Sequence, residues 1–108
     1  KISFSQTNFF DRVDFNGNVY IKGEDGKGFN ALLVNCITRH YKTKLKNAIR
    51  VYLILDGEGT FTINNKKEVS LPNDMFIIED GDIYEYEGKM KLFEFNIPPT
   101  NSSNEEKL

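Results

Sequence analysis

The sequence predicts an all-β protein, an antiparallel sandwich or barrel, and two observations support this. Phe and Tyr together supply 14 of the 108 residues, alongside runs rich in Val, Ile and Thr, and such side chains pack well on a pleated sheet. Short apolar runs also alternate with turn-forming residues along most of the chain. A chain of this length forms one domain, because two independently stable cores would each be too small.

Alternation and turn residues together define the predicted strands. Gly, Asn, Asp and Pro separate them, as at Asn16-Gly17, Asp56-Gly57, Asp80-Gly81 and Gly88. The strands are expected at residues 18–22, 29–41, 50–55, 60–63, 68–71, 75–78, 83–86 and 91–97. Residues 4–15 fit either a short helical turn or an edge strand. After Pro98-Pro99 the chain is polar and acidic, so residues 100–108 are expected to be a mobile tail or to lie on the surface.

Residue parity along each strand assigns the faces of the sheet, since successive side chains point to opposite sides. His40 falls at the end of an apolar row within 29–41. Residues 51–55 are apolar on both faces, so this strand is central or lies at a subunit contact, and we expect a homodimer. The predicted buried residues include Leu32, Val34, Ile54, Ile63, Phe76, Ile78, Phe93 and Phe95.

Charge and cysteine content narrow the classes of partner. The formal net charge is −2 with acids and bases interspersed, so no basic surface for nucleic acid or for an anionic membrane is expected. Cys36 is the only cysteine, which excludes an internal disulfide and a thiolate zinc site and favours the cytoplasm. No apolar run is long enough to span a bilayer. The sequence begins with Lys1, and its first residues do not have the pattern of a signal peptide. The expected partner is a small molecule.

Two spaced motifs carry a family resemblance. Arg50 precedes Gly57 by the spacing that separates a metal-binding Glu from Gly in the first cupin motif. Asn73, Glu79, Gly81 and Tyr84 fall, without insertion, on the Gly, Pro, Gly and His of the second. From about residue 31 to 99 the chain therefore resembles a small single-domain cupin. The resemblance implies an RmlC-like antiparallel jelly-roll β-barrel within residues 1–99, followed by the polar tail at 100–108.

The positions that bind metal in cupins carry other residues in this sequence. The resemblance puts Arg50 in place of the ligand Glu and Tyr84 in place of the second-motif His. The window "TKLKN" at 43–47 has no histidine for the paired His ligands. A guanidinium is always protonated and repels a cation, so we expect neither a metal nor another cofactor.

The cupin frame and strand parity turn Arg50, Tyr52, Tyr84 and Tyr86 inward, with His40 near the barrel mouth. A guanidinium and several phenols suit a sugar, a sugar phosphate or a carboxylate, so these five residues are the predicted ligand site. In the alternative interpretation, Arg50 pairs with Glu79 or Glu85 and plugs the barrel.

Three functions remain open from the sequence. The preferred one is binding of a small polar ligand by a metal-free cupin without strong catalysis. The second is a metal-independent sugar isomerase or epimerase with His40 as base and Tyr84 as acid, because metal-free cupin epimerases resemble this arrangement. The third is a plugged structural or regulatory module that dimerises. Whether the protein is an enzyme is left open, with binding favoured over catalysis.

Overall fold

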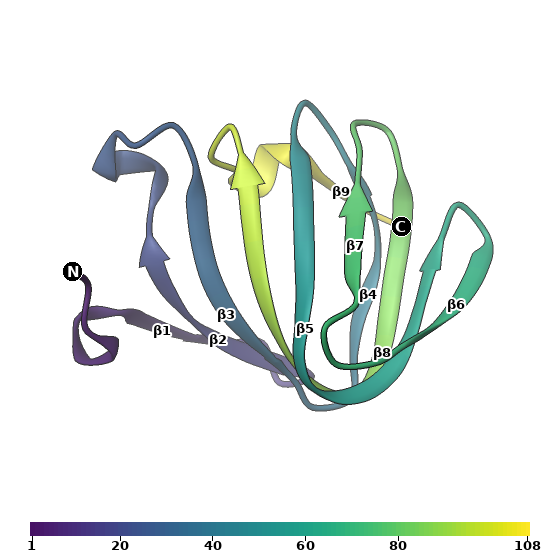
Figure 1. The fold of residues 1–108 in the computed structure, drawn as a ribbon. Coiled ribbons are helices and arrows are strands. Elements are labelled where there is room, and N and C mark those ends of the chain that lie inside the picture. Colours follow the sequence, from purple (N-terminus) through teal and green to yellow (C-terminus); the bar gives the residue numbers. More distant parts are fainter.

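The computed structural model describes residues 1–108 and shows one antiparallel sheet that curls into a half-barrel (Figure 1). Its strands are β1 (Asn8–Asp11), β2 (Phe15–Ile21), β3 (Asn30–Cys36), β4 (Arg39–Leu45), β5 (Ile49–Ile63), β6 (Lys66–Ser70), β7 (Met75–Ile78), β8 (Ile83–Ile97) and β9 (Glu105–Lys107). Three short 3-10 turns, η1 (Phe4–Gln6), η2 (Gly23–Asp25) and η3 (Ser102–Asn104), are the only helical elements. None of them has the length and apolar character that a membrane-crossing helix requires. The predicted all-β antiparallel architecture is confirmed.

The sheet is organised around β8. Its neighbours on one side are β3 and β4, and the strand order along that path is β1-β2-β3-β8-β4-β9. On its other side β8 pairs with β5, which in turn pairs with β6 and β7. The first half of β8 thus lies between β4 and β5, and the second half between β3 and β5.

The two longest strands were expected as four shorter ones, and that expectation is wrong. Instead of turning at Asp56-Gly57 and Gly88, β5 and β8 run on and pair from Ile49↔Ile97 to Ile63↔Tyr84, with one bulge after Ile54. The glycines lie where the two backbones come closest. A Cβ added at Gly59 would collide with the carbonyl oxygen of Glu87, and one at Gly88 would meet Gly59 itself. Glycine in these strands marks close backbone approach rather than a turn.

The single strand predicted over 29–41 is in fact two strands. β3 ends at Cys36, and β4 continues in the same direction along β8 after an interruption at Ile37 and Thr38, whose backbone N–H groups both donate to the carbonyl of Asp14. The Thr38 hydroxyl also donates to the Asp14 carboxylate at 2.6 Å. His40 therefore belongs to β4, not to the end of the β3 row, yet its side chain is buried. Residues 4–15 contain both elements that were left open, a 3-10 turn and the edge strand β1.

The core lies on the concave side of the sheet. Leu32, Val34, Ile54, Phe76 and Ile78 are buried as predicted. Ile63, Phe93 and Phe95 are only partly buried, which corrects the prediction. The inward row of β8 consists of its even-numbered residues, so its phenylalanines face outward, where Phe95 stacks on Phe29 at 5.0 Å.

The convex face of β7 and of the first half of β5 is apolar and uncovered. Met75 and Ile77 are about half exposed, at 56% and 52%, and they lie opposite Leu53 and Val51 of β5. Ile49, Leu55 and Ile97 add further exposed apolar surface. Nothing else in the chain covers this face.

Candidate functional site

Tyrosine and phenylalanine rings fill the lower part of the barrel interior. Tyr52, Tyr84, Tyr86 and Phe61 are each at most 2% exposed. Phe61 stacks on Phe76 at 4.2 Å and on Tyr86 at 4.7 Å. None of these four rings lines the two cavities that reach Arg50.

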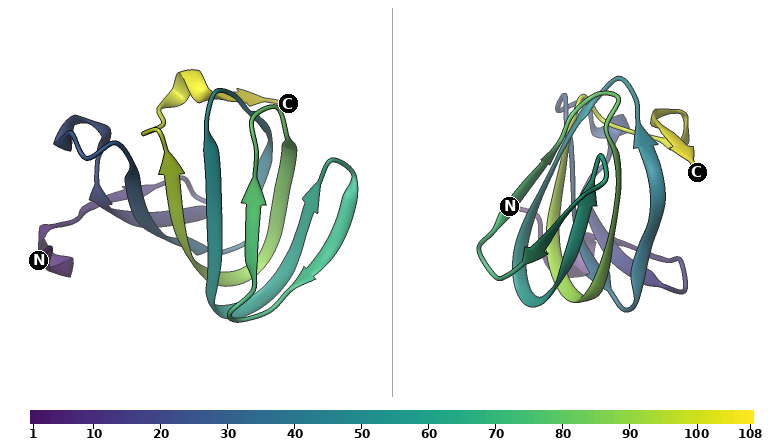
Figure 2. Two further views of the ribbon diagram at one scale, coloured as in Figure 1. Left: turned by 45° about the horizontal axis from the view of Figure 1, so that its top comes forward. Right: turned by 90° about the vertical axis from the view of Figure 1, so that its right-hand side faces the viewer.

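Two adjoining cavities of about 400 and 150 Å³ occupy the mouth. They share the walls Phe10, Arg12, Leu32, Tyr41, Arg50 and Glu105. The smaller one reaches His40, Phe15 and Glu94. The larger one extends to Thr100, Asn101 and Ser102 of the C-terminal segment, residues 100–108, which crosses the open end of the barrel (Figure 2).

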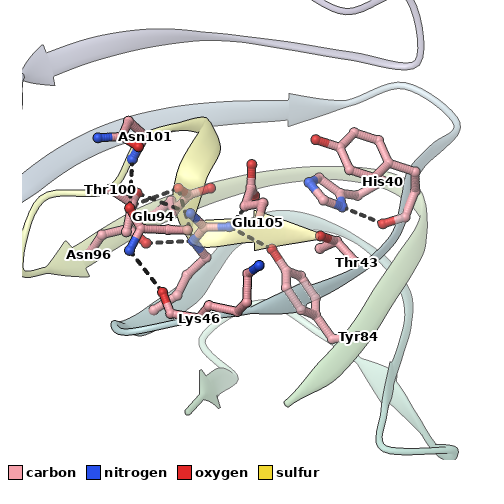
Figure 3. A network of polar contacts seen from close by, with 12 residues as sticks. His40, Thr43, Lys46, Tyr84, Glu94, Asn96, Thr100, Asn101 and Glu105 are labelled. Atoms are coloured by element: carbon pink, nitrogen blue, oxygen red, sulfur yellow. Dashed lines mark hydrogen bonds and ion pairs between the residues drawn. The ribbon is translucent and has the colours of Figure 1, made fainter. Parts of the chain in front are cut away.

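Arg50 forms the floor of both cavities and is only 4% exposed. Its Nε donates to Asn96 Oδ1 and lies 3.4 Å from Glu94 Oε2. Its Nη1 donates to Tyr84 OH at 2.9 Å and to Glu105 Oε1 at 2.7 Å, and Nη2 donates to Thr100 Oγ1 at 3.1 Å. Figure 3 shows these partners converging from β8 and the C-terminal segment.

The charge of Arg50 is balanced within the protein. Burial alone lowers the pKa of Arg50, but its acidic neighbours, Glu94 foremost, more than offset this and hold the pKa well above its usual value. The acids paired with Arg50 are Glu94 and Glu105, so the alternative that named Glu79 or Glu85 had the wrong partners. The guanidinium is charged and already carries two carboxylates.

The tyrosine hydroxyls beneath Arg50 form a short chain. Tyr84 OH accepts from Arg50 and lies 2.8 Å from Tyr52 OH. Burial raises the pKa of Tyr84 to about 12 and that of Tyr52 well above its usual value, so both stay protonated near neutral pH. Tyr86 OH is buried and has no hydrogen-bond partner.

His40 is held in one orientation at the wall of the smaller cavity. Its Nδ1 lies 2.8 Å from the carbonyl oxygen of Tyr41, which can only accept, so Nδ1 carries the proton. The ring packs against Tyr41, Phe15 and Tyr86 at centroid distances of 4.4, 4.9 and 5.1 Å. Burial lowers the pKa of His40. At neutral pH the imidazole is uncharged, and its Nε2 lone pair is bound by no protein group.

The structure places the five predicted site residues in the interior but at different depths. His40 and Arg50 line the mouth, whereas Tyr52 and Tyr84 lie below Arg50 and Tyr86 packs beneath His40. Their role in binding a ligand stays a prediction. The sequence did not single out the other wall residues, which are Phe10, Arg12, Phe15, Leu32, Tyr41, Glu94, Thr100, Asn101, Ser102 and Glu105.

The residues at the cupin metal position do not fit a metal ion. Thr43 and Leu45 are the buried, inward residues of the 43–47 window, and neither is a ligand for a transition metal. No group of three or more His, Cys, Asp and Glu side chains is arranged to hold one. The guanidinium of Arg50 adds a fixed positive charge at that point.

Comparison with known proteins identifies the fold. No protein-family model and no curated protein sequence matches the chain. The nucleoside dehydratase Pac13 from Streptomyces superposes with a TM-score of 0.87 at 16% identity, covering 100% of this chain and 89% of Pac13. KdgF from Halomonas sp. has a TM-score of 0.81 at 8% identity, over 94% of this chain and 96% of its own.

A third solved structure carries the fold name. The cupin domain of Schizosaccharomyces pombe Cnp3 has a TM-score of 0.74 at 20% identity, over 89% of this chain and 72% of that one. These identities are low, so the comparisons show the fold and leave activity open. The chain has the cupin fold, an antiparallel jelly-roll barrel, as the motif spacing implied.

Proposed function

We propose that this protein binds a small polar ligand with a sugar or nucleoside ring in the mouth of its barrel, without a metal ion. The observation that carries the proposal is the pair of cavities above Arg50 and His40. The larger has a volume of about 400 Å³, which is within the range of sites that enclose small organic ligands. Pac13, which shares the fold, has been solved with uridine.

The walls of the cavities suit such a ligand. Phe10, Phe15 and Tyr41 offer flat apolar faces on which a ring can stack. Arg12, Glu94 and Glu105 offer charged donors and acceptors for hydroxyl groups. This combination favours a polar ring over a purely apolar ligand.

Thermal shift with uridine, sugar phosphates and nucleotide sugars tests the proposal, because a ligand that binds only the folded state raises the melting temperature. Phe10→Ala should abolish the shift, since Phe10 lines both cavities. Phe9→Ala is the matched control, because Phe9 is the neighbouring residue of β1, is 63% exposed and lines neither cavity. If no compound shifts the wild-type protein, or if both variants respond alike, the site is wrongly assigned.

A second candidate function is proton transfer with His40 as general base. The fixed tautomer, the lowered pKa and the unbound Nε2 support it. The reaction class is removal of a proton beside a carbonyl group, followed either by its return on the other face, as in an epimerase, or by loss of a neighbouring hydroxyl as water. Pac13 has been solved with uridine in variants that replace a histidine or a tyrosine. In this chain the His40 ring packs on Tyr41 and Tyr86.

Exchange of ligand protons with solvent deuterium, followed by NMR, tests the base. A carbonyl-bearing ligand from the thermal-shift panel should take up deuterium with the wild-type protein and not with His40→Gln. The variant should still bind the ligand, which separates a base from a binding contact. Tyr84 as the acid stays a proposal, and its hydroxyl is engaged by Arg50 and Tyr52.

Metal independence is tested separately. The purified protein should contain no stoichiometric transition metal by elemental analysis, and its thermal shifts should survive treatment with EDTA. One Fe, Mn, Ni or Zn per chain would contradict the proposal. A cytoplasmic location stays a prediction, and the third function, a plugged module that dimerises, would be favoured if no ligand binds.

A further inference from the structure

The C-terminal segment supplies much of the wall of the larger cavity. Thr100, Asn101, Ser102 and Glu105 all line it, and two of them, Thr100 and Glu105, hydrogen-bond to Arg50. In Figure 2 the segment passes over the open end of the curled sheet. The smaller cavity, which reaches His40, shares Glu105 of this segment as a wall residue.

The contacts of Arg50 divide into two sets. Its Nε is held by Asn96 and Glu94, and Tyr84 accepts from Nη1, all from β8 within the barrel. The C-terminal segment takes the remaining donors, with Glu105 on Nη1 and Thr100 on Nη2. The barrel alone therefore fixes the guanidinium, and the segment occupies the two terminal nitrogens that a carboxylate or phosphate would bind as a pair.

Polar contacts and one cation–π contact, between Lys107 Nζ and the Tyr41 ring at 4.8 Å, hold the segment closed. β9 pairs with β4 at three positions, Thr43↔Lys107, Lys44↔Glu106 and Leu45↔Glu105. Asn104 exchanges two hydrogen bonds with the backbone of Lys46, both of 2.8 Å. The one large apolar residue, Leu108, is 56% exposed. A segment that buries no apolar side chain can separate from the barrel without disrupting the core.

We propose that the C-terminal segment is a gate, which the Glu105 carboxylate holds shut and which an anionic group of the ligand opens. The ligand's carboxylate or phosphate replaces Glu105 and Thr100 on Arg50, and β9 leaves β4. The identity of the opening group rests on the proposed function, whereas the gate itself does not. The ligand class is thereby narrowed to a polar ring that bears an anion.

His40 provides a measure of gate opening that needs no ligand, because it is the only histidine in the chain. Diethyl pyrocarbonate acylates a neutral imidazole nitrogen, and the product is quantified by absorbance and by mass spectrometry of the His40 peptide. Glu105→Gln should be modified roughly tenfold faster than the wild-type protein, because the charge that holds the gate is lost. Glu106→Gln is the matched control, since Glu106 is exposed and makes no ion pair.

A disulfide between β4 and β9 locks the gate. Lys44 and Glu106 are register partners, so Lys44→Cys with Glu106→Cys in a Cys36→Ser background joins the two strands. Modification of His40 should be slow in the oxidised protein and should return to the Cys36→Ser rate on reduction. Both states are the same polypeptide, so a general loss of folding affects them alike.

Hydrogen exchange tests the ligand chemistry. Inorganic phosphate and acetate, each against chloride at equal ionic strength, should speed exchange at the amides of residues 104–108 and not in β8. A response to phosphate only or to acetate only identifies the favoured anion. A gate that neither anion opens refutes the anionic ligand.

Equal His40 modification in the oxidised, reduced and Glu105→Gln proteins would show that the segment is a fixed wall and would refute the gate. A different combination is that the disulfide-locked protein resists His40 modification while no compound of the thermal-shift panel binds. That combination would support the gate and refute the proposed function.

Discussion

Replacing Arg50 by Met should destabilise the protein by removing the charge between two acids. The Met side chain has similar reach and keeps most of the apolar packing. It removes the hydrogen bonds to Asn96, Tyr84 and Thr100 and leaves Glu94 and Glu105 without their cation. The free energy of unfolding should therefore fall.

The burial of the three side chains sets the size of the effect. Arg50, Glu94 and Glu105 have side-chain exposures of 5%, 12% and 24%. Breaking a buried ion pair by removing one partner costs roughly 3–5 kcal/mol. Glu105 lies on a polar surface segment and can turn to water, whereas Glu94 is fixed in β8. We therefore expect about 3 kcal/mol, the lower end of that range.

Urea denaturation of the wild-type protein, Arg50→Met, Glu94→Gln and the double variant measures this. The double variant should recover about 1–2 kcal/mol relative to Arg50→Met, because the orphaned carboxylate is gone. A loss below about 0.5 kcal/mol for Arg50→Met would refute the reasoning, since it is the size expected of a surface substitution. Additive effects of the two substitutions would show that Arg50 and Glu94 do not interact.

Three further predictions concern His40, the β1–β2 turn and the outer face. Because burial lowers the pKa of His40, the unfolded chain binds a proton before the folded one does. The free energy of unfolding should therefore drop between about pH 7 and pH 5, and less so in His40→Gln; equal pH profiles would contradict this. Val13 has a φ of 70° and is 85% exposed, so Val13→Asn should stabilise the protein by about 1 kcal/mol in urea denaturation, and a loss would show that the turn is unstrained. We also propose a homodimer that forms through the exposed apolar face containing Ile77. Light scattering should show a dimer, which Ile77→Glu should dissociate and Val69→Glu, on β6, should leave intact. A monomeric wild-type protein would contradict the proposal.

Strand parity correctly predicted which side chains face the barrel interior wherever alternate residues of one predicted strand could be assigned to one face. Arg50, Tyr52, Tyr84 and Tyr86 are all buried, because period-two alternation holds through each of their strands. The face of β8 beyond Gly88 was predicted wrongly, because residues 91–97 were treated as a separate strand and apolar character then favoured Phe93 and Phe95 over Glu94 and Asn96. A buried Glu and Asn are stable there because Arg50 lies opposite, and a one-dimensional pattern does not show that partner.

The C-terminal contribution to the site had no signal in the sequence. Residues 100–108 lack apolar alternation, so nothing distinguished β9 from a surface tail. Glu105 is recognisable only once the fold brings it over Arg50, 55 residues away in sequence. Polar contacts between distant segments are set by tertiary structure, which is why the candidate site was only half predicted.

The close approach of the paired strands β5 and β8 at Gly59 and Gly88 bears on how the barrel moves. The pairing of β5 with β8 extends through this point, from Ile49↔Ile97 to Ile63↔Tyr84. The two strands therefore form one rigid ribbon that connects both halves of the sheet. Widening the mouth by spreading these strands would break pairs along their full length. Opening of the barrel is therefore confined to elements at the edges of the sheet. While those elements move, β5 and β8 keep Arg50, Tyr52 and Tyr84 at constant distances from one another.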